Sequence, residues 1–190
     1  YCHLCEANGI AIATRAENGF QPTAAELAPH LRDARLLSLS SPLNPAGTGF
    51  AAHGLAAIAR AVVAENRRRG PTAAPLFLLY DQIYWLLAAS SAPHTTPVEL
   101  VPEVAPYTLM IDGISKAFAA TGLRVGWAIG PPFLISRMKD FLGHVGAWAP
   151  RPEQVATAEL FADPALVHAL SGAVREGVNL RLAALDRGLT

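Results

Sequence analysis

The chain has 190 residues, of which 52% are hydrophobic, so it is long enough and apolar enough to bury the core of one domain. Its 15 basic and 15 acidic side chains give a formal net charge of zero, which disfavours binding to nucleic acid or to an anionic membrane surface. Only 16% of the residues are charged, which indicates apolar surface that a further domain or a partner subunit covers.

Short β-rich runs alternate with helical stretches along the chain. The runs are continuously apolar rather than alternating in polarity, as in strands that are buried on both faces. The predicted strands are residues 9–14, 35–39, 76–80, 108–111 and 124–129. The predicted helices are residues 23–31, 50–69, 97–104, 132–143, 152–161 and 164–188. This order predicts an α/β fold with a mostly parallel sheet.

The ends of the chain carry no targeting or membrane signal. The longest apolar run, residues 74–89, is interrupted by Asp81 and Gln82 and is too short to cross a bilayer. The N-terminus has no initiator Met, so we interpret the chain as a central fragment, with a partial domain over 1–163 and a helix over 164–190 that leads to a further domain. Cys2 and Cys5 have no second cysteine pair, so no metal site is expected.

Lysine is rare in this sequence. Of the fifteen basic side chains, only Lys116 and Lys139 are lysines. An arginine guanidinium stays protonated and cannot form an imine, whereas a lysine amine in apolar surroundings can lose its proton and act as a nucleophile. Lys116 stands among Ile114, Ala117 and Phe118, while Lys139 stands in a polar part of a predicted helix. Lys116 is therefore the lysine expected to do chemistry.

Three polar segments directly follow predicted strands, where the ligands of open α/β sheets bind. They are residues 41–49 (SPLNPAGTG), 81–84 (DQIY) and 112–126 (DGISKAFAATGLRVG). Together they resemble the class I and II aminotransferases of fold type I, whose signatures are an S-x-x-N-P-x-G turn, a D-x-x-Y strand end and an S-K-x-x-x-x-x-G-x-R-x-G loop. All three occur in the family's order, and Arg124 stands eight positions after Lys116 as the family pattern requires.

The resemblance implies a fold and an activity. The fold would be the large cofactor-binding domain of fold type I, with three α/β/α layers. The activity would be that of a cytoplasmic aminotransferase that uses pyridoxal 5'-phosphate (PLP) to move an amino group between an L-amino acid and a 2-oxo acid, by default 2-oxoglutarate. The full-length form would be a homodimer, with no nucleic-acid or membrane partner. The family's upstream phosphate-binding turn, upstream ring-stacking aromatic residue and downstream substrate-binding arginine are not identifiable in this sequence.

Three residues take catalytic roles when the resemblance is carried over position by position. Lys116 would hold PLP as a Schiff base and later shuttle a proton between the substrate Cα and the cofactor's C4′. Asp81 would pair with the pyridine nitrogen and keep the ring cationic, so that the ring accepts electrons. Tyr84 would hydrogen-bond the phenolic oxygen of the cofactor.

The remaining cofactor-binding residues follow from the same resemblance. Asn44 would share the phenolic oxygen with Tyr84, while Ser115 and Arg124 would hold the phosphate, with Arg124 supplying a charge-assisted fork. Many family members carry a second serine three residues before the lysine. Here that position is Gly113, so one phosphate contact is missing or is replaced by backbone.

Other interpretations of the same residues stay open. The site could serve β-elimination or α,γ-elimination, as in PLP-dependent lyases, or the chain could be the PLP-binding sensor domain of a transcription regulator. Taken singly, Asp81 could be a strand-end cap, Asn44 a turn residue and Arg124 a surface charge. Trp85 is expected in the core or an interface, and His94 is expected to be structural or solvated.

Overall fold

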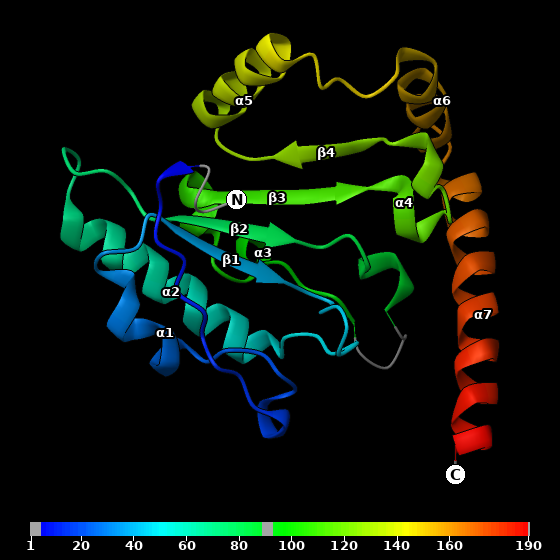
Figure 1. Ribbon diagram of the computed structural model, residues 1–190, viewed down its shortest axis with the longest axis horizontal. Helices are drawn as coiled ribbons and strands as arrows, with labels where there is room; N and C mark the ends of the chain where they lie inside the picture. The colour runs from blue at the N-terminus through cyan, green and yellow to red at the C-terminus, as the bar shows by residue number, and fades with distance from the viewer. Residues whose placement is uncertain (1–4, 89–92, 190) are drawn as a thin grey trace.

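A four-stranded sheet in the order β1-β2-β3-β4 runs through the molecule (Figure 1). This computed structural model describes residues 5–88 and 93–189, so Cys2 lies outside the described residues. The strands β1, β2 and β3 are parallel, and β4 is antiparallel to β3, which confirms the expected α/β fold with a mostly parallel sheet. Their bounds are Leu36–Ser40 (β1), Phe77–Asp81 (β2), Thr108–Gly113 (β3) and Gly126–Ile129 (β4).

The helices surround this sheet on several sides. In Figure 1, α1 and α2 cover one side of β1 and β2, α5 and α6 lie beyond β4, and α7 stands at the edge where β1, β2 and β3 end. The α-helices are α1 (Ala24–Leu31), α2 (Ala52–Arg69), α3 (Pro97–Leu100), α4 (Ile114–Ala117), α5 (Pro132–Val145), α6 (Arg151–Phe161) and α7 (Pro164–Leu189). Short 3-10 helices are η2 (Ala16–Asn18), η3 (Trp85–Leu87), η4 (Pro102–Tyr107) and η5 (Thr121–Leu123).

Local sequence signals account for several helix ends. The Thr23 hydroxyl accepts a hydrogen bond from the Glu26 backbone N–H at 3.3 Å, and Glu26 reaches back to the Thr23 N–H, which completes a capping box at the start of α1. Pro132 and Pro164 are the first residues of α5 and α7, as predicted from the tolerance of proline in a first helical turn. The helix α2 ends before Gly70, whose φ of 74° suits a residue without a Cβ.

The core lies between the sheet and the helices α1 and α2. Side chains alternate along β2, so Leu78 and Tyr80 are fully buried while the other three residues of the strand are half-buried. Leu55, Ile58 and Val62 of α2 pack in the same cluster of buried side chains. Asp81 therefore ends β2 on the opposite, less covered face of the sheet.

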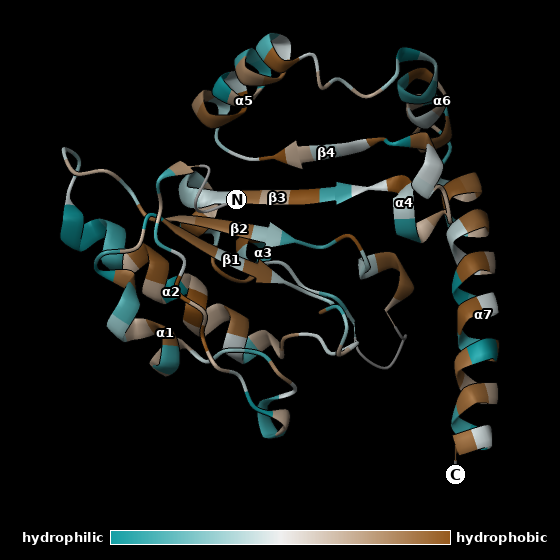
Figure 2. Ribbon diagram, viewed as in Figure 1, coloured by the Kyte–Doolittle hydropathy of each residue, from teal (hydrophilic) through white to brown (hydrophobic). Residues whose placement is uncertain are grey.

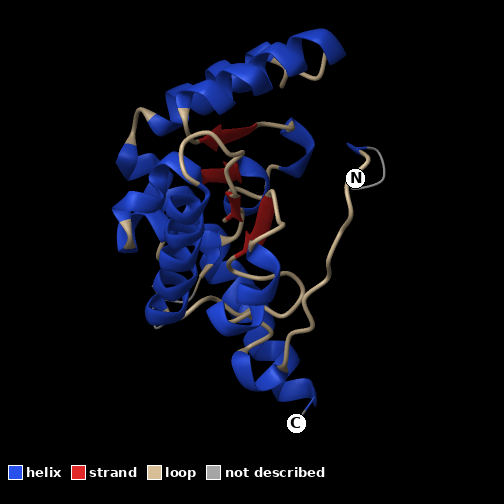
Figure 3. Cartoon of the chain, turned by 90° about the vertical axis from the view of Figure 1, so that its left-hand side faces the viewer, coloured by secondary structure: helices blue, strands red, loops and turns tan. Residues whose placement is uncertain are grey.

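Two predicted elements differ from the structure. The predicted strand over residues 9–14 is wrong, because this segment is an extended loop along the outside of the molecule (Figure 3). Ile10 is 62% exposed, and only Ile12 packs against the core, so too little apolar surface is buried to hold a strand. The predicted helix over 97–104 breaks at Val101, whose φ of −142° reflects the restriction that Pro102 places on the residue before it.

Much apolar surface is exposed at the β4 side of the molecule and along α7, where Figure 2 shows hydrophobic residues over the whole length of the helix. That a further domain or a partner subunit covers this surface stays a prediction. None of the helices in the described part of the chain is both long and apolar enough for a membrane span. The exposed large side chains of these elements include Ile129, Phe133, Phe141, Val145, Val155, Phe161, Leu166, Leu170, Leu180, Leu182, Leu185 and Leu189.

Two polar side chains near the end of α2 fasten this helix to its neighbours. The buried Asn66 amide donates to the carbonyl of Leu76 and accepts from the Leu76 N–H, both at 2.9 Å, just before β2 begins. Arg69 donates through Nη2 to the carbonyls of Leu31 and Ala34, each at 2.7 Å, at the end of α1. These bonds satisfy backbone groups that would otherwise lack partners.

We expect Asn66→Ala to lower the free energy of unfolding by about 2–3 kcal/mol, because both backbone groups of Leu76 lose their buried partner. Denaturant unfolding measures this change. Arg67→Ala, an exposed position on the same helix, is the matched control and should change stability by less than about 0.5 kcal/mol. Equal effects of the two substitutions would show that the Asn66 contacts are energetically unimportant.

The interactions of Glu65 should make the free energy of unfolding depend on pH in the acid range. Hydrogen bonds from Arg68 and Arg69 lower the pKa of Glu65 from 4.5 to about 2. A carboxylate with a lowered pKa stabilises the fold above its unfolded value of 4.5, and this contribution is lost as the pH falls towards 2. Glu65→Gln should therefore destabilise the protein at pH 7 and lose most of this effect as the pH falls to about 2, as measured by denaturant unfolding across that range. A stability difference that does not depend on pH would contradict this account.

Candidate functional site

The carboxyl ends of β1, β2 and β3 lie at one edge of the sheet, which faces α4 and α7 (Figure 1). The strand register places Ser40 beside Asp81 and Asp81 beside Ile111 in one row across the three strands. The three segments singled out in the sequence therefore leave the sheet from adjacent positions. This is the edge at which open α/β sheets bind ligands.

The loop after β1 folds back towards the end of β2. The Ser41 N–H donates to the Asp81 carbonyl at 2.9 Å, and Leu43 and Thr48 close the loop with a backbone bond of 2.7 Å. The peptide bonds before Pro42 and Pro45 are cis. Asn44 lies at the exposed tip of this loop.

Asp81 and Tyr84 are held by the turn that follows β2. Oδ1 of Asp81 accepts a hydrogen bond from the Ile83 N–H at 3.1 Å, which orients the carboxylate at the strand end. The Tyr84 hydroxyl accepts from Nδ2 of Asn44 at 3.4 Å, so side chains from the first two segments meet. The hydroxyl proton of Tyr84 is left for an acceptor in the site.

Lys116 approaches Tyr84 from the third segment. It lies on α4, a single helical turn that follows β3 directly, between the buried side chains of Ile114 and Ala117. Its Nζ lies 5.7 Å from the centroid of the Tyr84 ring. The structure thus brings together Lys116, Tyr84 and Asn44 beside the strand end that carries Asp81.

The side chains of Ser115 and Arg124 form no hydrogen bond with the other candidate residues in the described part of the chain. Ser115 is half-buried next to Lys116 on α4. Arg124 is exposed, has a left-handed backbone with φ of 58°, and donates through Nη1 to the Thr121 carbonyl at 3.0 Å. Its contact is therefore local, although η5, which precedes it, packs against α4.

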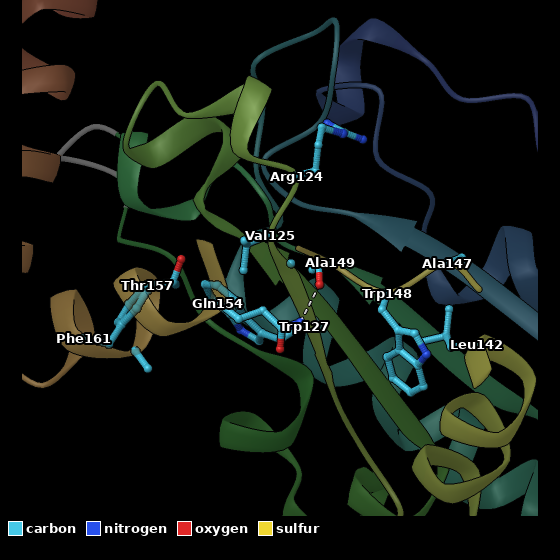
Figure 4. Close-up of a pocket in the computed structure, with 12 residues that line it drawn as sticks. Arg124, Val125, Trp127, Leu142, Ala147, Trp148, Ala149, Gln154, Thr157 and Phe161 are labelled. Atoms are coloured by element: carbon cyan, nitrogen blue, oxygen red, sulfur yellow. Dashed lines mark hydrogen bonds between the residues drawn. The ribbon is translucent and has the colours of Figure 1, made fainter. Parts of the chain in front are cut away.

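A pocket in the described part of the chain does not coincide with these residues. It has a volume of about 690 Å³, lies between β4, α5 and α6, and includes Trp127, Trp148 and Phe161 in its wall. Arg124 is the one candidate residue at its margin, and Figure 4 shows the Arg124 side chain pointing away from Trp127 and Phe161. The pocket is an apolar recess beside the outer strand, separate from the edge that carries Lys116.

Gly113 has a structural role that the sequence comparison does not reveal. It pairs with Gly126 across β3 and β4. A Cβ on Gly113 would lie 2.8 Å from the Val125 carbonyl oxygen and 3.1 Å from the Cα of Gly126, both backbone atoms. The absence of a serine here is therefore imposed by the close approach of the two strands.

Sequence reasoning missed a buried carboxylate next to the site. Oδ2 of Asp112 accepts a hydrogen bond from the Trp85 indole N–H at 2.6 Å, and Oδ1 accepts from the Gly113 N–H at 2.7 Å. Burial raises the pKa of Asp112, and these two hydrogen bonds oppose that rise. Asp112 ends a strand run as Asp81 does, so the rule that selected Asp81 could also have found it.

The comparison with protein families matches the description "Aminotransferase class I and II" over residues 1–189. The chain belongs to this aminotransferase family. The match extends over nearly the whole sequence and agrees with the three motifs described above.

Similar proteins carry several aminotransferase names. An aspartate aminotransferase from Rhizobium meliloti is 34% identical over 137 residues, which are 72% of this chain and 32% of that protein. An arginine–pyruvate transaminase from Pseudomonas aeruginosa is 31% identical over 137 residues, again 72% of this chain and 32% of that protein. The structure of a Thermus thermophilus aspartate aminotransferase with maleate matches with a TM-score of 0.84 and 28% identity, over 95% of this chain and 44% of that one. The chain thus spans less than half the length of these aminotransferases.

We expect Gly113→Ser to lower the free energy of unfolding by about 2 kcal/mol, because the added Cβ meets backbone atoms that cannot move aside alone. Gly122→Ser is the matched control, since a Cβ on Gly122 meets nothing within 4 Å and the residue lies in the same lysine-to-arginine loop. Denaturant unfolding of the two variants measures the difference. If Gly113→Ser is as stable as Gly122→Ser, then β3 and β4 can move apart at Gly113 without cost, which would contradict this account.

Proposed function

We propose that this chain is the cofactor-binding part of a PLP-dependent aminotransferase. The observation that carries the proposal is the meeting of Lys116, Tyr84 and Asn44 beside Asp81, at the ligand-binding edge of a chain that belongs to the family. The activity is proposed for the full-length protein, in which residues 1–163 belong to the cofactor-binding domain and α7 leads to a second domain.

The donor set of the site fits the chemical groups of PLP. A protonated ring nitrogen requires a carboxylate, which Asp81 offers at the end of β2. A phenolic oxygen requires hydrogen-bond donors, which the Tyr84 hydroxyl and the Asn44 amide supply from adjacent positions. The aldehyde requires an amine, and Lys116 is the lysine that reaches this group of residues.

The phosphate group calls for a cation and further donors. Arg124 offers a guanidinium, whose planar fork matches two phosphate oxygens, and its exposure leaves it accessible. Ser115 adds a hydroxyl directly beside Lys116. Since Gly113 has no side chain to offer, its backbone or a group from elsewhere takes the place of the second serine.

Each residue then has a distinct task in transfer of the amino group. When bound, the cofactor supplies a cationic ring that accepts the electron pair released at the substrate Cα. Asp81 would keep the proton on the ring nitrogen, and Tyr84 and Asn44 would donate to the phenolic oxygen. Lys116 would hold the cofactor through Nζ, and its amine, when free, would move a proton at the substrate Cα.

The names of the relatives support transamination over elimination or a sensor function. We propose an L-amino acid and a 2-oxo acid as substrates, with 2-oxoglutarate as the default acceptor. Relatives named for aspartate and for arginine with pyruvate are about equally similar, so the identity of the amino acid does not follow from the family. A cytoplasmic homodimer is the proposed form of the full-length protein.

Borohydride reduction of the full-length protein in the presence of PLP tests the proposal. The reduced cofactor should be found by peptide mapping on Lys116, because its amine is the one positioned beside Tyr84. Lys116→Arg should lose the label, since a guanidinium does not condense with an aldehyde, while Lys139→Arg should retain it. Label on Lys139, or on no lysine of the wild-type protein, would overturn the assignment.

A further inference from the structure

A hydrogen-bonded cluster around a buried carboxylate joins the turn after β2 to the end of β3. Its centre is the Asp112 carboxylate, which is only 8% exposed. The carboxylate accepts from the Trp85 indole at 2.6 Å and is also hydrogen-bonded to the Gln82 side chain. Gln82 and Trp85 stand on either side of the Ile83–Tyr84 pair, so both ends of that turn are tied to Asp112.

The cluster lies on the face of the sheet opposite Asp81. Tyr80 pairs with Met110 across β2 and β3, and both pack in the core beneath α2. Asp112 follows Met110 by two residues and so shares that face, whereas Asp81 points to the other one. Asp112 is therefore placed to support the site from behind rather than to touch a ligand that Asp81 binds.

Aromatic contacts hold Trp85 in this position. The His94 ring lies 5.9 Å from the Trp85 ring and 5.9 Å from the Tyr80 ring, measured between centroids. Nε2 of His94 is 3.3 Å from Oε1 of Gln82, so the histidine contacts both residues that bind Asp112. Burial lowers the pKa of His94, which favours a neutral ring in this packing.

We propose that Asp112 is a positioning residue, which acts through Trp85 and Gln82 to hold Tyr84 against Lys116. The inference rests on the proposed function. The side chain of Tyr84 is hydrogen-bonded to Asn44 of the loop after β1 at 3.4 Å, which is long for a hydrogen bond, whereas the Trp85–Asp112 bond is short and partly buried. The bond from Trp85 to Asp112 thus fixes how far the Tyr84 hydroxyl stands from the Lys116 amine.

The spectrum of the bound cofactor reports this distance without measuring turnover. A hydrogen bond from the Tyr84 hydroxyl to the phenolic oxygen would withdraw electron density from the cofactor. It would therefore lower the proton affinity of the Lys116 nitrogen that is bonded to the cofactor. A displaced Tyr84 should raise the pH midpoint of the visible absorption band of the Lys116-bound cofactor. Tyr84→Phe removes the hydroxyl, so its change in the pH midpoint is the largest change that the loss of this hydrogen bond can cause.

The test uses Trp85→Phe, which keeps a ring but removes the N–H donor, and Asp112→Asn, which keeps the shape but removes the charge. Each should raise the midpoint in full-length protein by about 0.5–1 pH unit, where one unit is a tenfold change in proton affinity. Combined with Tyr84→Phe, each should add little further shift, because all act through one hydroxyl. The matched controls are Trp148→Phe, whose side chain is 52% exposed, and Asp140→Asn, which is also exposed.

Two outcomes would overturn the inference. One is a pH midpoint in Trp85→Phe that equals the wild-type value. This result would overturn the inference even if Asp112→Asn does not fold. The other is a shift of the same size with and without the Tyr84 hydroxyl, which would show an effect independent of Tyr84. Borohydride labelling in parallel separates the two proposals: label on Lys116 with an unshifted midpoint overturns only the role of Asp112, whereas no label on wild-type Lys116 overturns the proposed function and this inference with it.

Discussion

The site depends on the register of three parallel strands. Because Ser40, Asp81 and Ile111 stand in one row, the segments that follow them begin side by side. A slip of one residue would turn Asp81 to the opposite face and bring Tyr80 out of the core. The fully buried Leu78 and Tyr80 oppose such a slip, since burying each large apolar side chain contributes about 1.5–3 kcal/mol. The core thus determines where the site can form.

The same alternation separates two kinds of polar residue at this edge. Asp81 ends β2 on the less covered face, where its carboxylate is accessible to a ligand, while Asp112 is buried on the face beneath α2. A buried carboxylate is costly unless it is hydrogen-bonded, and the Trp85 indole and the Gly113 N–H supply such bonds. Asp81, the last residue of β2, and Asp112, the last but one of β3, therefore have different surroundings, and only Asp81 is proposed to face the cofactor.

Local patterns predicted the fold well, and the segments predicted to form the site do leave adjacent strand ends. The helices α1, α2 and α7 follow apolar periodicity and capping signals that lie within the helix or next to it, and the three motifs leave strands that were themselves predicted. Residues 9–14 have a comparable local pattern, but their structure depends on a partner strand that the described sheet does not provide. The Trp85–Asp112 bond joins residues 27 positions apart, and no local pattern specifies such a pair.

Gly113 shows why a departure from a family motif needs a structural explanation. From the motif alone, glycine in place of serine means a lost phosphate contact. In the structure, Gly113 and Gly126 let β3 and β4 approach closely, and the Ile114 N–H donates to the Val125 carbonyl at 3.2 Å immediately before α4. That approach fixes where the lysine turn begins. The residue that offers no side-chain donor therefore helps to place Lys116, and in the proposed site the side chains that would bind the phosphate are those of Ser115 and Arg124.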